Sequence, residues 1–312
     1  MTAYLSAKQK LHFEDLRVSF KQANLAQPAS CSRVFEGAEF DFVYNLAAET
    51  KYGQSEEVYQ DRIFQVSINL ANEAIKNKVK VFVEMSTAQV YDPHKKPAKE
   101  DSKLKPFTQQ AKMKLKAEEE LKKIVGLPLV ILRPALVYGP NDTLGLSESI
   151  LDLTFSAPRL IIGAVYRKLN EEMKFLWTKD LKLNTVHVSD VSRALWHVSA
   201  TKDIKGGRSG PVSKCEIYNL CDKEDTDQGT INNFIEEIFG IKTGFHGTII
   251  SSFAKLNLES VTEDSNDKHL QPWAELCKSG NVMNTPLTPY LDKELLKDNA
   301  LSVDGTKVHF CY

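Results

Sequence analysis

Two neighbouring residues with hydroxyl side chains are the first candidates in this sequence for a chemical role. Ser86 and Thr87 directly follow the apolar run Val79–Met85 (VKVFVEM), which predicts a buried strand. A hydroxyl at a strand end can hydrogen-bond a substrate carbonyl or alcohol, or it can cap the end of the strand itself. These residues alone leave both roles open.

Residues after two other predicted strands could line a ligand site. Leu46, Ala47 and Ala48 end the run FDFVYNL and begin the segment after it, where small side chains would let a flat cofactor lie against the backbone. A tight turn also explains them. The run Leu127–Leu132 (LPLVIL) leads into a further group of candidates, which comprises Arg133, Pro134, Ala135, Val137 and Tyr138. His187, in VHVSDV, is the last candidate, and a single histidine is commonly structural.

The elements that must position these residues alternate along the chain. Strands are predicted at Phe40–Leu46, Val79–Met85 and Leu127–Leu132, and helices at Glu56–Asn77 and Ala111–Val125. Such alternation predicts βαβ units and a doubly wound parallel sheet of the Rossmann type, in the α/β class.

Further elements are predicted on both sides of this core. They are a strand at Val18–Ala23, a helix at Val165–Met173, a strand and helix at Thr185–Trp196 with Asp190 as N-cap, a strand at Glu216–Leu220, and a helix at Thr230–Phe239 that ends at Gly240. Residues 1–140 are predicted to form a partial dinucleotide-binding domain. Residues 141–312 are predicted to complete the sheet and to form a smaller α/β substrate region.

Composition excludes several classes of protein. The 312 residues carry a net charge of -1, which argues against binding to nucleic acid by phosphate neutralisation. The five cysteines form no C-x-x-C pair, so neither a disulfide framework nor a metal site is expected. The sequence shows no secretory signal and no apolar run of membrane-spanning length, so a cytoplasmic protein that does not bind membranes is expected.

Four segments, taken together and in order, resemble the extended short-chain dehydrogenase/reductases of the NAD-dependent epimerase/dehydratase family. They are DFVYNLAAET, VFVEMSTAQVYD, VILRPALVYGP and NTVHVSDVSRALW. The resemblance covers about residues 20–239. It implies NAD or NADP as cofactor and a hydroxylated small-molecule substrate such as a nucleotide sugar. A homodimer is left open as a further partner.

The resemblance also implies roles for individual residues. Thr87 takes the place of the catalytic hydroxyl, with Ser86 beside it, and Lys114 takes the place of the lysine that lowers the pKa of a catalytic tyrosine and binds the nicotinamide ribose. Cofactor contacts are implied for Leu46, Ala47, Ala48, Ser86, Lys114, Arg133, Pro134, Ala135 and Val137. Substrate contacts are implied for Thr87, Tyr138 and His187.

The sequence departs from the family at the catalytic tyrosine. Gln110 stands at the tyrosine position of Tyr-x-x-x-Lys, and a shifted alignment places Thr108 before Lys112. An amide does not titrate near pH 7, so it cannot act as the acid or base. Tyr91 or Tyr138 could substitute, or both could pack structurally. The lysines could equally lie on a solvated helix face.

The glycine-rich loop that usually opens such a fold is also absent. The first glycine is Gly37, and Gly206, Gly207 and Gly210 follow no strand and open no helix, which is typical of a surface turn. The first βαβ unit is therefore predicted to be truncated. Three functions follow: an NAD(P)-dependent oxidoreductase, epimerase or dehydratase; a catalytically degenerate member that binds a dinucleotide or a protein; and a truncated isoform with little activity. The first is favoured, and enzymatic activity itself is left open.

Overall fold

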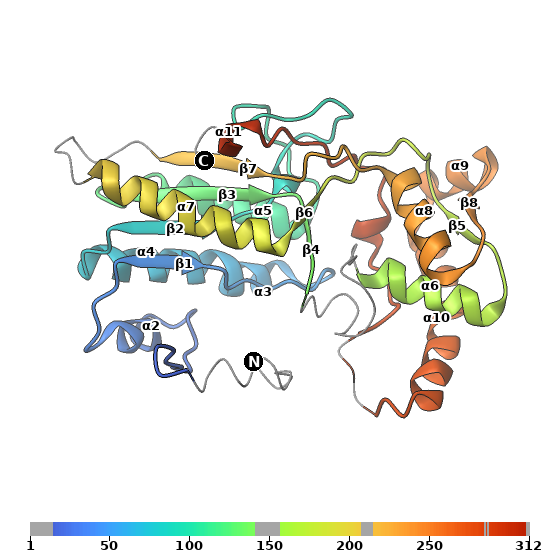
Figure 1. The fold of residues 1–312 in the computed structure, drawn as a ribbon, viewed down its shortest axis with the longest axis horizontal. Coiled ribbons are helices and arrows are strands. Elements are labelled where there is room, and N and C mark those ends of the chain that lie inside the picture. The colour runs from blue at the N-terminus through green and yellow to red at the C-terminus, as the bar shows by residue number, and fades with distance from the viewer. Residues whose placement is uncertain (1–14, 141–156, 207–214, 284, 286, 310–312) are drawn as a thin grey trace.

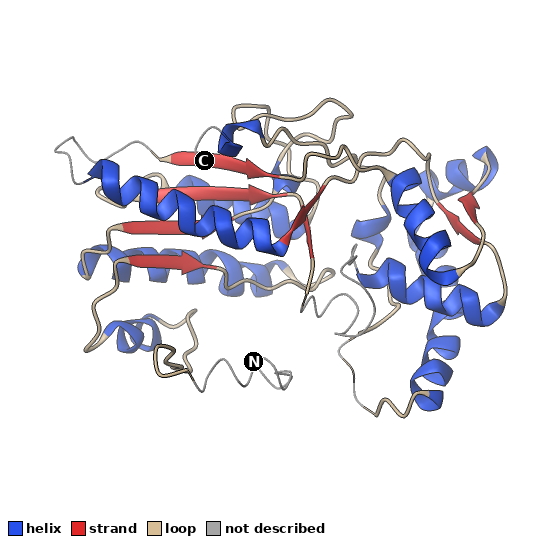
Figure 2. Ribbon diagram, viewed as in Figure 1, coloured by secondary structure: helices blue, strands red, loops and turns tan. Residues whose placement is uncertain are grey.

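A computed structural model describes residues 15–140, 157–206, 215–283, 285 and 287–309. A parallel sheet with helices on both faces forms one part, and a smaller, mainly helical lobe lies beyond its end (Figures 1 and 2). The elements, in chain order, are α2 (Pro28–Phe35), β1 (Phe42–Asn45), α3 (Glu56–Tyr59), the π-helical η1 (Gln60–Gln65), α4 (Val66–Lys76), β2 (Val81–Met85), the 3-10 helix η2 (Ala88–Val90), α5 (Gln109–Leu121), β3 (Leu129–Pro134), β4 (Leu136–Tyr138), α6 (Ala157–Leu169), β5 (Met173–Phe175), β6 (Thr185–His187), α7 (Val188–Gly206), β7 (Glu216–Leu220), α8 (Gln228–Phe239), β8 (Thr243–Phe245), α9 (Thr248–Leu256), α10 (Leu258–Ser279), the 3-10 helix η3 (Lys293–Leu296) and α11 (Thr306–His309).

The main sheet has the order β1-β2-β3-β7, and its strands are all parallel. Val81, Phe82 and Val83 of β2 are fully buried, as expected for a strand covered on both faces. Helix α7 covers one face, and α4 and α5 cover the other (Figure 1). The predicted α/β fold with a parallel sheet is therefore confirmed.

Short side-chain contacts set where the helices begin and end. Ser55 accepts a hydrogen bond from Val58 N ahead of α3, and Thr108 accepts one from Ala111 N ahead of α5. Helix α8 ends at Gly240, which has a φ of 63° and so adopts the left-handed conformation that glycine tolerates best. The predicted stop at Gly240 is confirmed.

Three predictions about the elements are wrong. No strand forms at Val18–Ala23, where Val18 and Phe20 are exposed and pair with no strand in the described chain. The helix placed at Val165–Met173 is α6, which starts earlier and stops before Asn170 because that residue adopts a φ of 55°. Asp190 lies inside the first turn of α7 and so is not its N-cap.

The smaller lobe comes from the second half of the chain. Helices α6, α8, α9 and α10 make up most of this lobe, and the short parallel pair β5 and β8 lies at its outer edge (Figure 1). Its core includes Ile162, Met173, Phe175 and Ile235. The pair β4 and β6 lies where the sheet ends, so the carboxyl ends of the strands face the lobe (Figure 1).

Candidate functional site

Thr87 and Ser86 occupy different environments at the carboxyl end of β2. Thr87 is half-buried and accepts a hydrogen bond from Gln89 N at 3.2 Å, which starts η2. Ser86 is buried and donates to Glu118 Oε1 at 2.5 Å. Thr87 is therefore positioned by a local turn, whereas the Ser86 hydroxyl belongs to an internal network.

Lys114 lies on the sheet-facing side of α5 and is buried. Its Nζ is 3.2 Å from Glu84 Oε1 and donates to Met85 O at 2.6 Å. Glu84 is fully buried and also accepts from Asn45 Nδ2 at 2.6 Å and Ser67 Oγ at 3.0 Å. The ammonium group thus neutralises a carboxylate in the protein interior.

Gln110 occupies the turn of α5 before Lys114. Its Nε2 donates to Glu49 O at 2.8 Å, which ties the start of α5 to the segment after β1. Lys112, from the shifted alignment, is exposed. Thr108, its partner in that alignment, is the buried N-cap of α5 and donates to Gln89 Oε1 at 2.8 Å. Neither alignment therefore places a titratable group before the lysine.

Arg133 lies at the end of β3 and holds three elements together. Its guanidinium is almost fully buried, with Nη2 at 2.5 Å from Glu118 Oε2 on α5 and Nη1 donating to Tyr91 OH at 2.9 Å. The Tyr91 hydroxyl in turn donates to Asn219 Oδ1 on β7 at 2.7 Å. Burial raises the pKa of Tyr91 to about 12, so Tyr91 is not suited to replace the catalytic tyrosine.

Tyr138 and His187 are brought together by the pairing of β4 with β6. They are register partners, and their rings meet edge to face at 5.2 Å between centroids. Burial, followed by the neighbouring carboxylate of Asp222, raises the pKa of Tyr138 to about 12. A phenol with this pKa is a poor base near pH 7.

The remaining predicted cofactor contacts lie at the carboxyl ends of β1 and β3. Leu46 is exposed, and Ala47 N donates to Asn45 Oδ1 at 3.3 Å. Ala48 packs against the cluster of Tyr59, Ile63 and Met113. Pro134 and Ala135 are buried, whereas Val137 is exposed. These residues share one end of the sheet, and their role in binding a cofactor stays a prediction.

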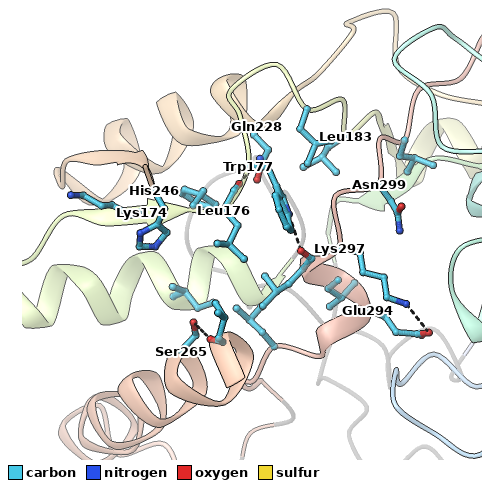
Figure 3. Close-up of a pocket in the computed structure, with 18 of the residues that line it drawn as sticks. Lys174, Leu176, Trp177, Leu183, Gln228, His246, Ser265, Glu294, Lys297 and Asn299 are labelled. Atoms are coloured by element: carbon cyan, nitrogen blue, oxygen red, sulfur yellow. Dashed lines mark hydrogen bonds and ion pairs between the residues drawn. The ribbon is translucent and has the colours of Figure 1, made fainter. Parts of the chain in front are cut away.

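A cavity of about 180 Å³ lies between this end of the sheet and the smaller lobe. Gln89 and Thr108 line its sheet side, and His269 is among the residues of its lobe side. Trp177 and Gln228 also line the lobe side (Figure 3). Thr87, Tyr138 and His187 are not among its lining residues, although Thr87 is two positions from Gln89.

The residues on the lobe side of this cavity were not predicted from the sequence. Its residues come from α6, β5, α8, α10 and η3, which are far apart in the chain. One local signal was present: Val261, Ser265 and His269 recur at four-residue spacing in α10 and so share one helix face.

Two further features concern the described ranges as a whole. Within them, no group of three or more His, Cys, Asp or Glu is placed to hold a metal ion. The helices of the same ranges include none that is both long and apolar enough to cross a membrane.

Solved structures of known proteins share this architecture at low sequence identity. Pal from Bacillus thuringiensis is 17% identical, with a TM-score of 0.60, over 97% of this chain and 84% of that protein. UDP-glucose 4-epimerase from Thermotoga maritima, solved with UDP-glucose, is 22% identical, with a TM-score of 0.56, over 73% and 70%. DesIV, a dTDP-glucose 4,6-dehydratase from Streptomyces venezuelae solved with NAD, is 20% identical, with a TM-score of 0.59, over 77% and 70%.

Comparison by sequence assigns the chain to a protein family. No curated protein matches the chain. The NAD dependent epimerase/dehydratase family model, however, matches residues 3–221, which is well over half of the 312 residues. The predicted resemblance is confirmed, and the chain belongs to the NAD dependent epimerase/dehydratase family.

Proposed function

We propose that this chain binds a small molecule in the cavity between the sheet and the smaller lobe without carrying out the proton and hydride transfer of its family. The observation that carries this proposal is the burial of Lys114 against Glu84, with Gln110 in place of the tyrosine. General acid–base catalysis needs a positioned group that titrates near the working pH, and this helix turn offers none.

The same residues decide how well a nicotinamide cofactor fits this chain. Family membership implies NAD, and DesIV was solved with NAD. In this chain the Lys114 ammonium is engaged by Glu84 and by Met85 O, and the Gln110 amide by Glu49 O. These two positions therefore do not fit the nicotinamide end of the cofactor, and no catalytic step is assigned to it.

Hydride transfer tests the proposal directly. The protein is mixed with NAD⁺ or NADP⁺ and UDP-glucose, dTDP-glucose or simple secondary alcohols. Absorbance at 340 nm is followed for the alcohols, and conversion of the sugar nucleotides is followed by chromatography, because epimerisation and dehydration leave no net reduced cofactor. We expect neither reduced cofactor nor converted sugar nucleotide above the rate without protein, and no change with Thr87→Ala. Turnover by the wild type that Thr87→Ala abolishes would overturn the proposal.

One observation favours a second candidate function. Thr87 is half-buried at the carboxyl end of β2, two positions from Gln89, which lines the cavity. This supports an NAD- or NADP-dependent oxidoreductase, epimerase or dehydratase acting on a hydroxylated substrate such as a nucleotide sugar. The absorbance and chromatography assays together separate the two candidates, because only the second predicts turnover that depends on Thr87.

A further inference from the structure

One wall of the cavity is a short stretch of chain that runs from the smaller lobe back to the sheet. We call residues 291–299, which include η3, the strap. Leu291, residues 294–297 and Asn299 of the strap line the cavity. Glu294, Lys297 and Asn299 can be seen along this wall (Figure 3). The position of the strap therefore affects how open the cavity is.

The strap has little buried surface, although the chain at both of its ends is fixed. No residue of η3 is buried, and residues 297–299 are exposed. At one end, Leu291 accepts a hydrogen bond from Asn266 Nδ2 of α10 at 2.9 Å and donates one to Asn266 Oδ1 at 2.7 Å. At the other end, Leu301 is buried and donates to Lys182 O at 2.8 Å. A segment with few buried side chains opens at a lower free energy than the packed elements around it.

Glu294 ties the strap to the sheet side of the cavity. Its carboxylate accepts from Gln109 N, at the start of α5, at 3.1 Å and 3.3 Å. That amide is one of those that a helix N-terminus leaves without an acceptor inside the helix, and the helix dipole favours a negative charge there. Lys297 Nζ is 4.0 Å from Glu294 Oε1, so it leaves this contact in place (Figure 3).

Trp177 makes a second contact with the strap, and its backbone is strained. Its Nε1 donates to Leu296 O at 2.8 Å (Figure 3). Its φ of 73° is rare for a bulky residue with a Cβ. Such strain persists only where the surroundings hold it, and it is concentrated at ligand clamps and switch segments. Release of Leu296 would let Trp177 relax, so the strain favours opening of the strap.

We propose that the strap is a gate, and that it moves away from the sheet side of the cavity between its anchor points at Leu291 and Leu301. Glu294 is the latch, and the hydrogen bond from Trp177 is the second contact that keeps the gate closed. Short segments that close over a binding site commonly control access to it. The inference rests on the proposed ligand-binding function, whose site the gate regulates.

Native-state hydrogen exchange, read by mass spectrometry, tests the latch without any ligand. Glu294→Ala removes the acceptor of Gln109 N, so we expect the amides of the strap to exchange about 3–10-fold faster, which is the net worth of one hydrogen bond. Exchange in α10 should stay unchanged, because the gate opens without global unfolding. Unchanged exchange in the strap, or equal acceleration in the strap and in α10, would overturn the proposal.

Two further variants make the test of the latch specific. Glu294→Gln keeps a neutral acceptor and should give an exchange rate between those of the wild type and Glu294→Ala. Lys293→Ala is the matched control. Lys293 is also on η3 but does not line the cavity, and its Nζ is 3.0 Å from Glu259 Oε1 in an exposed ion pair. Exposed pairs contribute little, so its exchange should be close to that of the wild type. Acceleration as large as that in Glu294→Ala would contradict a specific latch.

Trp177→Phe tests the second contact. It removes the donor to Leu296 O and keeps an aromatic side chain in the wall, so the strap should again exchange faster. If both contacts hold the same gate, the accelerations in Glu294→Ala/Trp177→Phe should multiply. No acceleration in Trp177→Phe would contradict the gate as proposed. Failure of this inference is distinguishable from failure of the proposed function, because exchange of the strap needs neither ligand nor turnover.

Discussion

Glu84 binds the ammonium group of Lys114 in the protein interior. A carboxylate on β2, fully buried, requires a cation and hydrogen-bond donors nearby, and it obtains them from Lys114, Asn45 and Ser67. The sequence shows the missing tyrosine at Gln110 plainly. The sequence could not show that Lys114 pairs with Glu84. The four residues of this network come from β1, α4, β2 and α5, and they meet only in the folded chain.

Removal of Lys114 alone should destabilise the protein strongly. Lys114→Met leaves Glu84 buried without its cation, and breaking one side of a buried ion pair typically costs about 3–5 kcal/mol. The free energy of unfolding from urea titration measures this loss. The double variant Glu84→Gln/Lys114→Met should regain most of the stability. Additive losses would argue against a direct interaction.

His269 should make the protein sensitive to acid. Burial, with a smaller contribution from the charge of Lys268, lowers the pKa of His269 to about 4. The unfolded chain binds the proton near the usual pKa of about 6.5, so this contribution to stability is complete above that pH and is lost as the pH falls toward 4.

The size of the acid effect follows from these two values. Between pH 7 and pH 5 the wild type should lose about 2 kcal/mol more than His269→Leu does. Urea titrations of both proteins at both pH values measure the difference. His94→Gln, which alters an exposed histidine, should behave as the wild type does. Equal losses in wild type and His269→Leu would mean that His269 is solvated.

At the scale of elements, the alternation of apolar runs and charged helices was enough to place β1, β2, β3, β7, α4, α5 and α8. Their order and buried faces follow from local patterns. The strand expected at Val18–Ala23 failed because a strand also needs a neighbour, which a local pattern does not reveal. Helix α10 escaped notice because its cavity-facing residues lie in a polar segment.

The segment that leads into α11 packs against the end of β7 with little room. A Cβ at Gly305 would lie 2.8 Å from Cys221 Sγ and 3.3 Å from Cys221 N. Gly305→Ala should therefore cost about 1–3 kcal/mol, as overpacking does. Thermal or urea unfolding measures the cost. Cys221→Ala in the same chain removes the closest contact and should recover part of the loss; no recovery would place the strain in the backbone.

At the scale of the whole molecule, the family and the fold were predictable because four segments keep their order along the chain. The cavity was not, because its wall combines the sheet end with a lobe assembled from distant helices (Figure 1). The two-part division at residue 140, the homodimer and the cytoplasmic location remain predictions from the sequence.

Lys114 is expected to be a structural residue that does not contact the cofactor. Acetic anhydride labelling of the native protein, read by mass spectrometry with and without NADH, distinguishes a buried Lys114 from one that is open to the cofactor. Lys112, exposed on the same helix, is the internal reference. We predict rapid labelling of Lys112, little labelling of Lys114, and no effect of NADH on Lys114. Labelling of Lys114 at the rate of Lys112, with protection by NADH, would contradict the claim.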